Sequence, residues 1–224
     1  MQNNHKFLTL FKFLIMKLLL VSATKLELGS DSSIKTLKSV FPDIEILITG
    51  IGMVKTTYFL TDSILKSKPD FVLNIGICGS FSKQFPIGAI VNIVSEQFAD
   101  FGIDDNGKFI PIQEKNKISS SGILKNSFAK KINFPLVNGI TVNTVNGQKK
   151  IIEKVISNFH PDVESMEGAA VFYVCLMNKI PFAEIRSISN IVAPRNKNNW
   201  NSKLAIDNLS SALPKIISNI IQKN

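Results

Sequence analysis

The chain has 224 residues, of which 45% are hydrophobic, and this length and composition are enough for one well-packed domain rather than two. A formal net charge of +9 would suit a nucleic-acid-binding protein, but the lysines are scattered along the chain rather than gathered into one basic stripe. No zinc-finger spacing or arginine- and glycine-rich segment accompanies the charge, so a basic nucleic-acid-binding protein is the weaker alternative to an enzyme that acts on a small molecule.

The N-terminus allows two interpretations. The stretch "HKFLTLFKFLIMKLLLVSA" has features of a signal peptide, but Lys12 and Lys17 interrupt its apolar run. We favour the alternative that Met16 begins the domain, because "MKLLLVSATKLE" is typical of the first strand and loop of an α/β domain. Residues 1–15 are then a surplus extension, and residues 16–224 form the domain. No run of about 18 uncharged apolar residues occurs elsewhere, so the sequence predicts no membrane span.

Short apolar runs rich in β-branched residues alternate with longer stretches of helical period, which predicts an α/β fold with a largely parallel sheet. We expect strands over residues 17–23, 44–50, 71–76, 89–98, 139–145 and 182–189, and helices over 53–67, 147–158, 167–178 and 200–223, the last interrupted near Pro214. Residues 101–121 are polar and contain several glycines, so we expect a long excursion beyond the sheet there.

Cysteine and histidine, which often mark disulfides and metal sites, are rare in this chain. Cys78 and Cys175 each lie inside an apolar run, which favours buried, reduced thiols and a cytoplasmic protein over a disulfide. His5 and His160 are too far apart in the sequence to suggest a metal cluster or a catalytic triad. We therefore predict that the protein has no metal site.

Glycines directly follow two of the predicted strands. Gly50 and Gly52 stand in "TGIGMVK", and Gly76 and Gly79 stand in "NIGICGS". The backbone must turn tightly or approach a ligand closely at such positions. The first segment lacks the end of a Walker motif, and neither segment has the spacing of a dinucleotide fingerprint. The glycines indicate a small ligand over the sheet edge, and structural turns explain them nearly as well.

Three polar side chains fall next to the ends of predicted strands or helices. Glu167 stands in the first helical turn of "VESMEGAAVF", where it either interacts with the helix dipole or binds sugar hydroxyls beside the small residues that follow it. Asn190 ends the strand in "SISN" and is either a turn former or a site residue. Glu27 follows the first strand and is either a helix-terminal acid or a general base.

Taken in order, these segments resemble the nucleoside phosphorylase/nucleosidase superfamily from about Met16 to the C-terminus, and within it the futalosine hydrolase family. The resemblance rests mainly on "VESMEGAAVFYVC" and "PFAEIRSISNIVAPRNKNNW", with weaker support from "LLLVSATKLE", "TGIGMVKT", "LNIGICGSF" and "TVNTVNG". It implies a single-domain nucleoside phosphorylase-like α/β fold with a central mixed β-sheet flanked by helices.

The resemblance also implies an activity, which is hydrolysis of the N-glycosidic bond of futalosine to hypoxanthine and dehypoxanthine futalosine in menaquinone biosynthesis. The partners would be the nucleoside substrate and water, without a metal or organic cofactor, a nucleic acid or a membrane. The protein is expected to form a homo-oligomer.

The resemblance further implies roles for single residues. Glu27 matches a glutamate that activates water in the related methylthioadenosine/S-adenosylhomocysteine nucleosidases. Met166 and Glu167 match a pair that packs on the ribose and hydrogen-bonds it. Asn190 falls where those enzymes carry an aspartate that protonates the purine, so we expect Glu27 and Asn190 to be the catalytic residues.

Four further residues, Thr144, Val145, Arg195 and Trp200, are expected to contact the base or the 5′ substituent. Futalosine carries a carboxyphenyl group at its 5′ end, which suits a guanidinium and an indole by charge pairing and stacking. A solvated Arg195 and a Trp200 that only anchors the last helix explain these two residues equally well.

Two departures from the adenine nucleosidases bear on the substrate. An aspartate can accept from the amino group of adenine, whereas hypoxanthine offers a carbonyl that needs a donor such as the amide of Asn190. Ile77 stands where those enzymes carry a serine, and no arginine stands beside "NIGICG" to bind phosphate, which favours a hydrolase over a phosphorylase. A methylthioadenosine-type nucleosidase and a purine nucleoside phosphorylase remain the alternatives.

Overall fold

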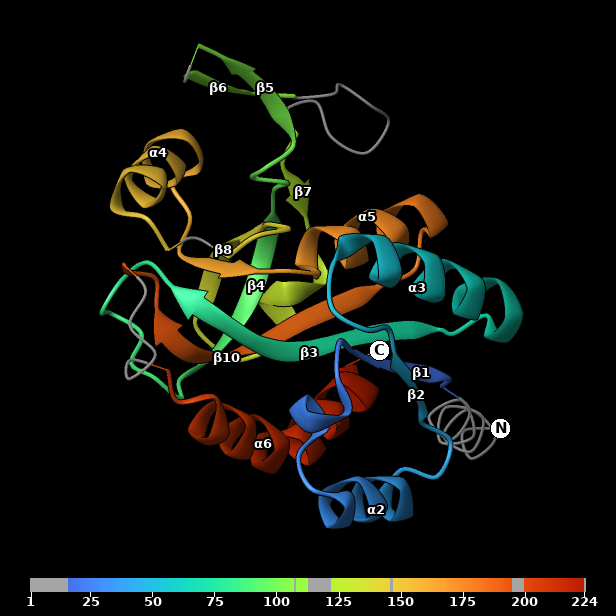
Figure 1. Ribbon diagram of the computed structural model, residues 1–224. Coiled ribbons are helices and arrows are strands. Elements are labelled where there is room, and N and C mark those ends of the chain that lie inside the picture. The colour runs from blue at the N-terminus through green and yellow to red at the C-terminus, as the bar shows by residue number, and fades with distance from the viewer. Residues whose placement is uncertain (1–15, 107, 113–121, 146, 195–199, 224) are drawn as a thin grey trace.

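The computed structural model describes residues 16–106, 108–112, 122–145, 147–194 and 200–223 (Figure 1). In chain order the elements are β1 (Leu18–Ser22), the 3-10 helix η1 (Lys25–Leu28), α2 (Asp31–Val40), β2 (Glu45–Ile48), α3 (Met53–Ser67), β3 (Phe71–Ser80), β4 (Ile90–Glu96), β5 (Gly102–Asp105), β6 (Lys108–Pro111), β7 (Leu124–Lys125), the 3-10 helix η2 (Phe128–Lys131), β8 (Leu136–Thr141), α4 (Lys149–Phe159), β9 (Val163–Ser165), α5 (Gly168–Asn178), β10 (Phe182–Ile191) and α6 (Ser202–Lys223). The predicted α/β fold with a central sheet is confirmed.

The central sheet is mixed. β1 lies parallel to β2 and β3, and β10 lies parallel to β3 but antiparallel to β4. β4, β8 and β9 are parallel neighbours, and β9 then pairs antiparallel with β3, so that β3, β10, β4, β8 and β9 form a closed path. Because β1, β3 and β10 are parallel, the loops that follow these three strands meet at one edge of the sheet.

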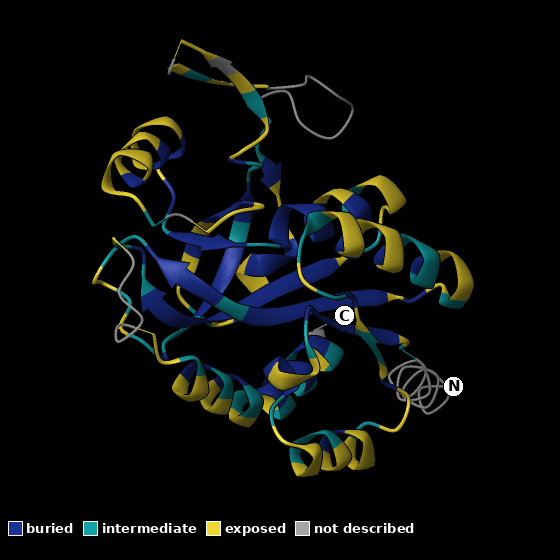
Figure 2. Ribbon diagram, viewed as in Figure 1, coloured by how far each residue is buried: buried dark blue, intermediate teal, exposed yellow. Residues whose placement is uncertain are grey.

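Helices cover the sheet on both faces, because side chains alternate along each strand. On β3, Val72 and Cys78 belong to the buried cluster with α3 and α5, whereas Phe71 and Leu73 belong to the cluster with α2 and α6. A smaller cluster joins α4 to β8. Figure 2 shows the result, with buried strands and with helices whose outer faces are exposed.

Several predicted elements are wrong in their bounds. The strand expected over residues 71–76 is β3, which runs to Ser80, so Gly76 and Gly79 lie inside the strand rather than in a loop after it. α6 continues past Pro214 without interruption, because Leu213, Ile216 and Ile217 are buried in the core and this packing outweighs the backbone hydrogen bond lost at proline. The strand expected over residues 139–145 is β8, which ends at Thr141. The expected excursion contains the hairpin of β5 and β6, which projects from the sheet in Figure 1.

The helices expected from the sequence do not include α2. This helix begins after the N-cap Ser30, whose hydroxyl accepts from the amide of Ser33 at 3.1 Å. Leu37 is its buried residue. Its aliphatic residues recur at Ile34, Leu37 and Val40, which is helical spacing, so the segment carried a signal that the prediction missed.

Two searches of the described ranges bear on membranes and metals. No helix in them is long and apolar enough to cross a membrane, and no three His, Cys, Asp or Glu side chains lie together as metal ligands would. Cys78 and Cys175 are free and buried, in agreement with the prediction of buried thiols.

Candidate active site

An edge cavity of about 410 Å³ opens where β1, β3 and β10 end, beside β9 and the start of α5. In open α/β sheets, ligands commonly bind at this edge. Among the residues proposed from the sequence, the cavity brings together Glu27, Gly79, Val145, Met166, Glu167, Asn190 and Trp200. These residues come from segments far apart in the chain, so the fold is what assembles them.

Glu27 is buried on η1 and accepts hydrogen bonds at both carboxylate oxygens. Oε2 accepts from the amide and the hydroxyl of Thr24 at 2.9 and 3.1 Å, and from the hydroxyl of Ser22 at 3.1 Å. Oε1 accepts from the amide of Ile77 at 3.1 Å, which leaves a lone pair of this oxygen for a ligand. The carboxylate is therefore fixed in orientation and still able to take a proton from a bound water.

Glu167 is buried at the N-cap of α5. Its Oε1 accepts from the amide of Gly52 at 3.1 Å, and its Oε2 lies 3.5 Å from Nη1 of Arg186. Burial raises the pKa of Glu167, whereas Arg186 and the Gly52 amide lower it and the charges of Glu27 and Glu184 raise it further. Such a carboxylate is suited to accept hydrogen bonds from the hydroxyls of a sugar.

Sequence reasoning missed Arg186, which is 1% exposed on β10. Its Nε donates to Oε1 of Glu184 at 2.7 Å. A Cβ on Gly76 would overlap Nη1 of Arg186 and approach Oε1 of Glu27, so the missing side chain at Gly76 lets the guanidinium lie beside the carboxylates. The signal was present in "FAEIRSIS", because two charged residues in an apolar strand must find partners in the core.

The expectation that no arginine stands beside "NIGICG" is therefore wrong in three dimensions. Nη1 of Arg186 lies 3.4 Å from the carbonyl oxygen of Ile77, within that segment. The guanidinium is nevertheless buried and paired with carboxylates, and it does not line the edge cavity. Its position thus does not offer a phosphate-binding group to the cavity.

Glu96 on β4 is a second buried carboxyl that sequence reasoning missed. Its Oε2 accepts from the hydroxyl of Thr141 at 2.9 Å, and its Oε1 lies with Oε1 of Glu184 against Gly168, where a Cβ would overlap both. Burial, reinforced by the charge of Glu184, raises the pKa of Glu96 well above its ordinary value. The protonated form of Glu96 is favoured as a result.

Asn190 reaches the edge cavity through an irregularity in β10. The pairing register with β3 shifts between Ile188 and Asn190, and bulges of this kind re-aim side chains beside active sites. The hydroxyl of Ser189 lies 2.8 Å from Oδ1 of Asn190 and 3.1 Å from the carbonyl oxygen of Cys78, and it has one proton to donate. When that proton goes to Oδ1, Nδ2 is the donor that remains for a ligand. A backbone bridge pairs Asn190 with Trp200, whose side chain is 45% exposed and also lines the cavity.

The other residues proposed from the sequence lie elsewhere. Gly50 and Gly52 have positive φ angles of 82° and 98° and form the turn before α3, outside the cavity lining. Thr144 is exposed and does not line the cavity, although its neighbour Val145 does. Arg195 lies outside the described residues.

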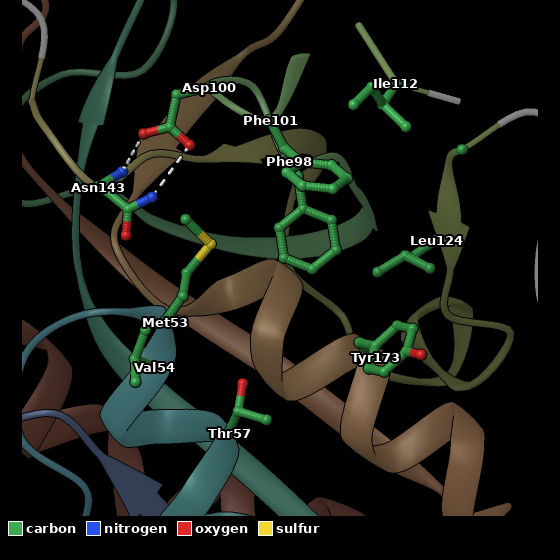
Figure 3. Close-up of a pocket in the computed structure, with 11 residues that line it drawn as sticks. Met53, Val54, Thr57, Phe98, Asp100, Phe101, Ile112, Leu124, Asn143 and Tyr173 are labelled. Atoms are coloured by element: carbon green, nitrogen blue, oxygen red, sulfur yellow. Dashed lines mark hydrogen bonds between the residues drawn. The ribbon is translucent and has the colours of Figure 1, made fainter. Parts of the chain in front are cut away.

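A helix cavity of about 440 Å³ lies beside α3 and α5. Figure 3 shows the apolar side chains that line it, among them Met53, Val54, Phe98, Phe101, Leu124 and Tyr173. The carboxylate of Asp100 accepts from both the backbone and the side-chain amide of Asn143, as the dashed lines in Figure 3 mark. Asp100 and Asn143 are thus paired with each other, while Thr57 and Tyr173 bring hydroxyls to the same wall.

The chain is similar to known proteins in both sequence and fold. Residues 38–222 match the Phosphorylase superfamily. The chain is 27% identical over 209 residues to the 5′-methylthioadenosine/S-adenosylhomocysteine nucleosidase of Buchnera aphidicola, which covers 88% of each chain. It is 24% identical over 180 residues to the futalosine hydrolase of Thermus thermophilus, which covers 77% of this chain and 80% of that one. The solved structure of futalosine hydrolase from Helicobacter pylori has the same fold, with a TM-score of 0.75 at 19% identity over 91% of this chain and 98% of that chain.

Proposed function

This chain belongs to the phosphorylase superfamily, and we infer that it is a nucleosidase, an enzyme that hydrolyses N-glycosidic bonds. We propose that its substrate is futalosine, which it cleaves to hypoxanthine and dehypoxanthine futalosine in menaquinone biosynthesis. The sugar is bound at Glu167 and Met166, the attacking water at Glu27, and the purine at Asn190. The observation that carries the choice of a 6-oxopurine is the neutral amide of Asn190 in the cavity wall, which can donate a hydrogen bond to a carbonyl.

The amide of Asn190 presents either Nδ2 or Oδ1 to the purine, depending on where the single proton of the Ser189 hydroxyl goes. We propose the arrangement in which Ser189 donates to Oδ1 at 2.8 Å rather than to the carbonyl oxygen of Cys78 at 3.1 Å, so that Nδ2 faces the cavity as a donor. The 6-carbonyl of hypoxanthine accepts from such a donor, whereas the 6-amino group of adenine would bring two donors together. A buried site that leaves a polar group unpaired rejects the wrong ligand strongly, and this supports hypoxanthine over adenine as the leaving group.

The residues around the cavity supply the groups that the proposed hydrolysis uses. Glu27 takes a proton from water while the water oxygen bonds to C1′ of the ribose and the bond from C1′ to the purine breaks. The electron pair of the broken bond goes to the purine, which the amide of Asn190 stabilises and which solvent then protonates. Positive charge develops on the sugar ring, and the carboxylates of Glu27 and Glu167 stabilise it.

The rim of the edge cavity supports a substrate with an aromatic 5′ group. Leu26 is 74% exposed there, and Ile51, Val145 and Trp200 are exposed beside it. An aromatic ring bound across these side chains would remove apolar surface from water. We propose that Arg195 binds the carboxylate of that aromatic group. Arg195→Ala should therefore slow futalosine cleavage and leave inosine cleavage nearly unchanged. Equal losses on both substrates would contradict this assignment.

A product assay tests the proposed function. The protein is incubated with futalosine, inosine and methylthioadenosine, with and without phosphate, and the free base and the sugar product are quantified. We expect hypoxanthine and a free sugar hydroxyl from futalosine without phosphate. Strict dependence on phosphate, or base release from methylthioadenosine but not from futalosine, would overturn the proposal.

The second candidate function is hydrolysis of methylthioadenosine or S-adenosylhomocysteine. The match to the Buchnera aphidicola nucleosidase favours it, because this match has 27% identity and covers 88% of both chains. In that case adenine nucleosides should be cleaved faster than 6-oxopurine nucleosides. Asn190 would then turn its oxygen toward the purine, and the proton of the Ser189 hydroxyl would go to the carbonyl oxygen of Cys78.

We also propose that the enzyme is a homo-oligomer that uses the outer face of α3. Val54, Tyr58 and Leu65 on this helix are 81%, 66% and 65% exposed and lie next to the helix cavity. A continuous exposed apolar patch is typical of an interface between proteins. Sedimentation should give a mass above that of the monomer, and Tyr58→Glu should lower it. A monomeric mass for the wild-type protein at all concentrations would refute the assembly.

A further inference from the structure

A line of buried charged side chains runs from the edge cavity into the core. Glu167 lies at the cavity wall, Arg186 lies behind it, and Glu184 and Glu96 lie deeper. We propose that Glu184 is a positioning residue of the nucleosidase reaction, which holds Arg186 against Glu167 and places its own negative charge near that carboxylate. This inference rests on the proposed role of Glu167 as the ribose-binding carboxylate.

Glu184 makes the shortest of the contacts that orient Arg186. Nε of Arg186 lies 2.7 Å from Oε1 of Glu184, whereas Nη1 lies 3.5 Å from Oε2 of Glu167 and 3.4 Å from the carbonyl oxygen of Ile77. Charge-assisted hydrogen bonds of the shorter length are the strong ones. Glu184 therefore decides where the guanidinium lies and how close its charge comes to Glu167.

The position of this pair on β10 follows from the strand geometry. Glu184 and Arg186 are two residues apart, so they project from the same face of the sheet, toward α5 and Glu167. Both are fully buried, and Oε2 of Glu184 and Nη2 of Arg186 have no hydrogen-bond partner within the described part of the chain. An ion pair that leaves polar atoms unsatisfied is a poor device for stability, and apolar residues would fill the space at lower cost. The pair is better explained by its effect on the cavity.

Glu96 completes the arrangement as a neutral neighbour of Glu184. Oε2 of Glu96 accepts from the hydroxyl of Thr141, which in turn accepts from the amide of Ala169 at 2.7 Å. The proton of Glu96 therefore belongs on Oε1, the atom that lies with Oε1 of Glu184 against Gly168. Two adjacent buried carboxyls cannot both ionise readily, so the negative charge stays on Glu184, next to Arg186.

The charged and titratable groups around Glu167 and Arg186 come from every element packed there. They are Glu27 on η1, Cys78 on β3, Glu96 on β4, Glu164 on β9, Cys175 on α5 and Glu184 on β10. Burial raises the pKa of both thiols, so they carry no charge near neutral pH. Arg186 is the cation in this group, and its distance from Glu167 controls how far the carboxylate is stabilised.

The exchange Glu184→Gln separates the charge of Glu184 from its shape. The glutamine still offers an acceptor to Nε of Arg186 but no longer adds a negative charge near Glu167. Because the charge of Glu184 contributes to raising the pKa of Glu167, that pKa should fall in the variant. The acid limb of kcat/KM for base release should therefore move to lower pH.

Three further variants sharpen this test. Glu96→Gln replaces a carboxyl that is already neutral and should leave the acid limb where it is. Arg186→Lys keeps the charge but cannot reach Glu184 and Glu167 together, so the acid limb should move to higher pH. The control Glu153→Gln changes an exposed carboxylate on α4 and should cause no movement.

The titration of Glu167 is best followed directly by carbon-13 NMR of the glutamate carboxyl groups, with the signal assigned by its loss in Glu167→Gln. This measurement needs no substrate, so an absence of base release counts against the proposed function while the NMR titration still decides the inference. We expect a shift to lower pH in Glu184→Gln and to higher pH in Arg186→Lys. An unmoved titration in both variants, with turnover reduced equally at every pH, would mean that Glu184 has only a structural role.

Discussion

The edge cavity and the helix cavity have similar volumes, about 410 and 440 Å³, but the polar side chains that line them differ in their hydrogen bonding. In the edge cavity, Glu27 and Asn190 are each oriented by hydrogen bonds and keep an atom for a ligand. In the helix cavity, Asp100 and Asn143 satisfy each other among apolar side chains. The difference teaches that pre-oriented polar atoms, rather than volume, distinguish a catalytic site from an apolar contact surface.

The largest effect is expected when the edge cavity loses its base. Glu27→Gln keeps the size of the side chain but cannot accept a proton from water, so kcat should fall by about 10²–10⁴-fold while KM changes much less. Steady-state kinetics of base release give both constants, and Glu153→Gln is the matched control at an exposed carboxylate. Wild-type turnover in Glu27→Gln would remove Glu27 from the mechanism.

The next largest effect is expected at Glu167, which we propose to contact the sugar in both the ground state and the transition state. Glu167→Gln should raise KM and lower kcat, with a loss of about 10²-fold in kcat/KM.

Glu167 also predicts the pH dependence of the wild-type enzyme. This carboxyl works in its ionised form and its pKa is raised, so activity should be lost as pH falls through a value above 4.5. A pH profile of kcat/KM tests this, and an acid limb below 4.5 would assign the titration to another group.

A smaller effect is expected on stability from Glu96, behind the edge cavity. The pKa of Glu96 is raised in the folded protein, whereas in the unfolded chain it is about 4.3. Above pH 4.3 the folded protein therefore holds a proton that the unfolded chain has lost. As a result, the free energy of unfolding falls by about 1.4 kcal/mol for each unit that the pH rises. Glu96→Gln removes this contribution. Denaturant unfolding at several pH values should show the variant gaining stability relative to wild type as pH rises from 4.3. Parallel curves would show that Glu96 ionises normally.

The smallest effect is expected in the helix cavity. Thr57→Val removes a hydroxyl from its wall and leaves the shape almost unchanged. Since no step of the proposed reaction takes place there, kcat/KM should match that of the wild-type protein. A large loss would show that the helix cavity takes part in catalysis, and the contrast between the two cavities would be wrong.

The sequence revealed those parts of the site whose signal is local. Glu27, Glu167 and Asn190 each fall next to the end of an apolar run, so the topology of an α/β sheet was enough to bring them to one edge. Arg186 and Glu184 pair with each other inside one strand, and Glu167, the cavity residue that Arg186 approaches, lies on another element, so the sequence pattern did not single them out.

The same distinction explains the errors in the fold. Long amphipathic or strongly apolar segments such as α3 and β3 were predicted, because their own residues specify them. The three-residue β9 depends on contacts made after folding and carries little local signal, whereas the short α2 has apolar residues at helical spacing that the prediction missed. The continuation of α6 through Pro214 likewise depends on packing against the sheet.

The most direct test of the central claim compares a matched pair of substrates in two enzymes. Inosine and adenosine differ at position 6 of the purine, and kcat/KM for each is measured with the wild-type protein and with Asn190→Asp. On the proposal that the amide of Asn190 donates to the 6-carbonyl, the wild-type protein should prefer inosine, and Asn190→Asp should reduce the inosine-to-adenosine ratio by at least about tenfold. An equal ratio in the two enzymes would contradict the claim that Asn190 selects a 6-oxopurine.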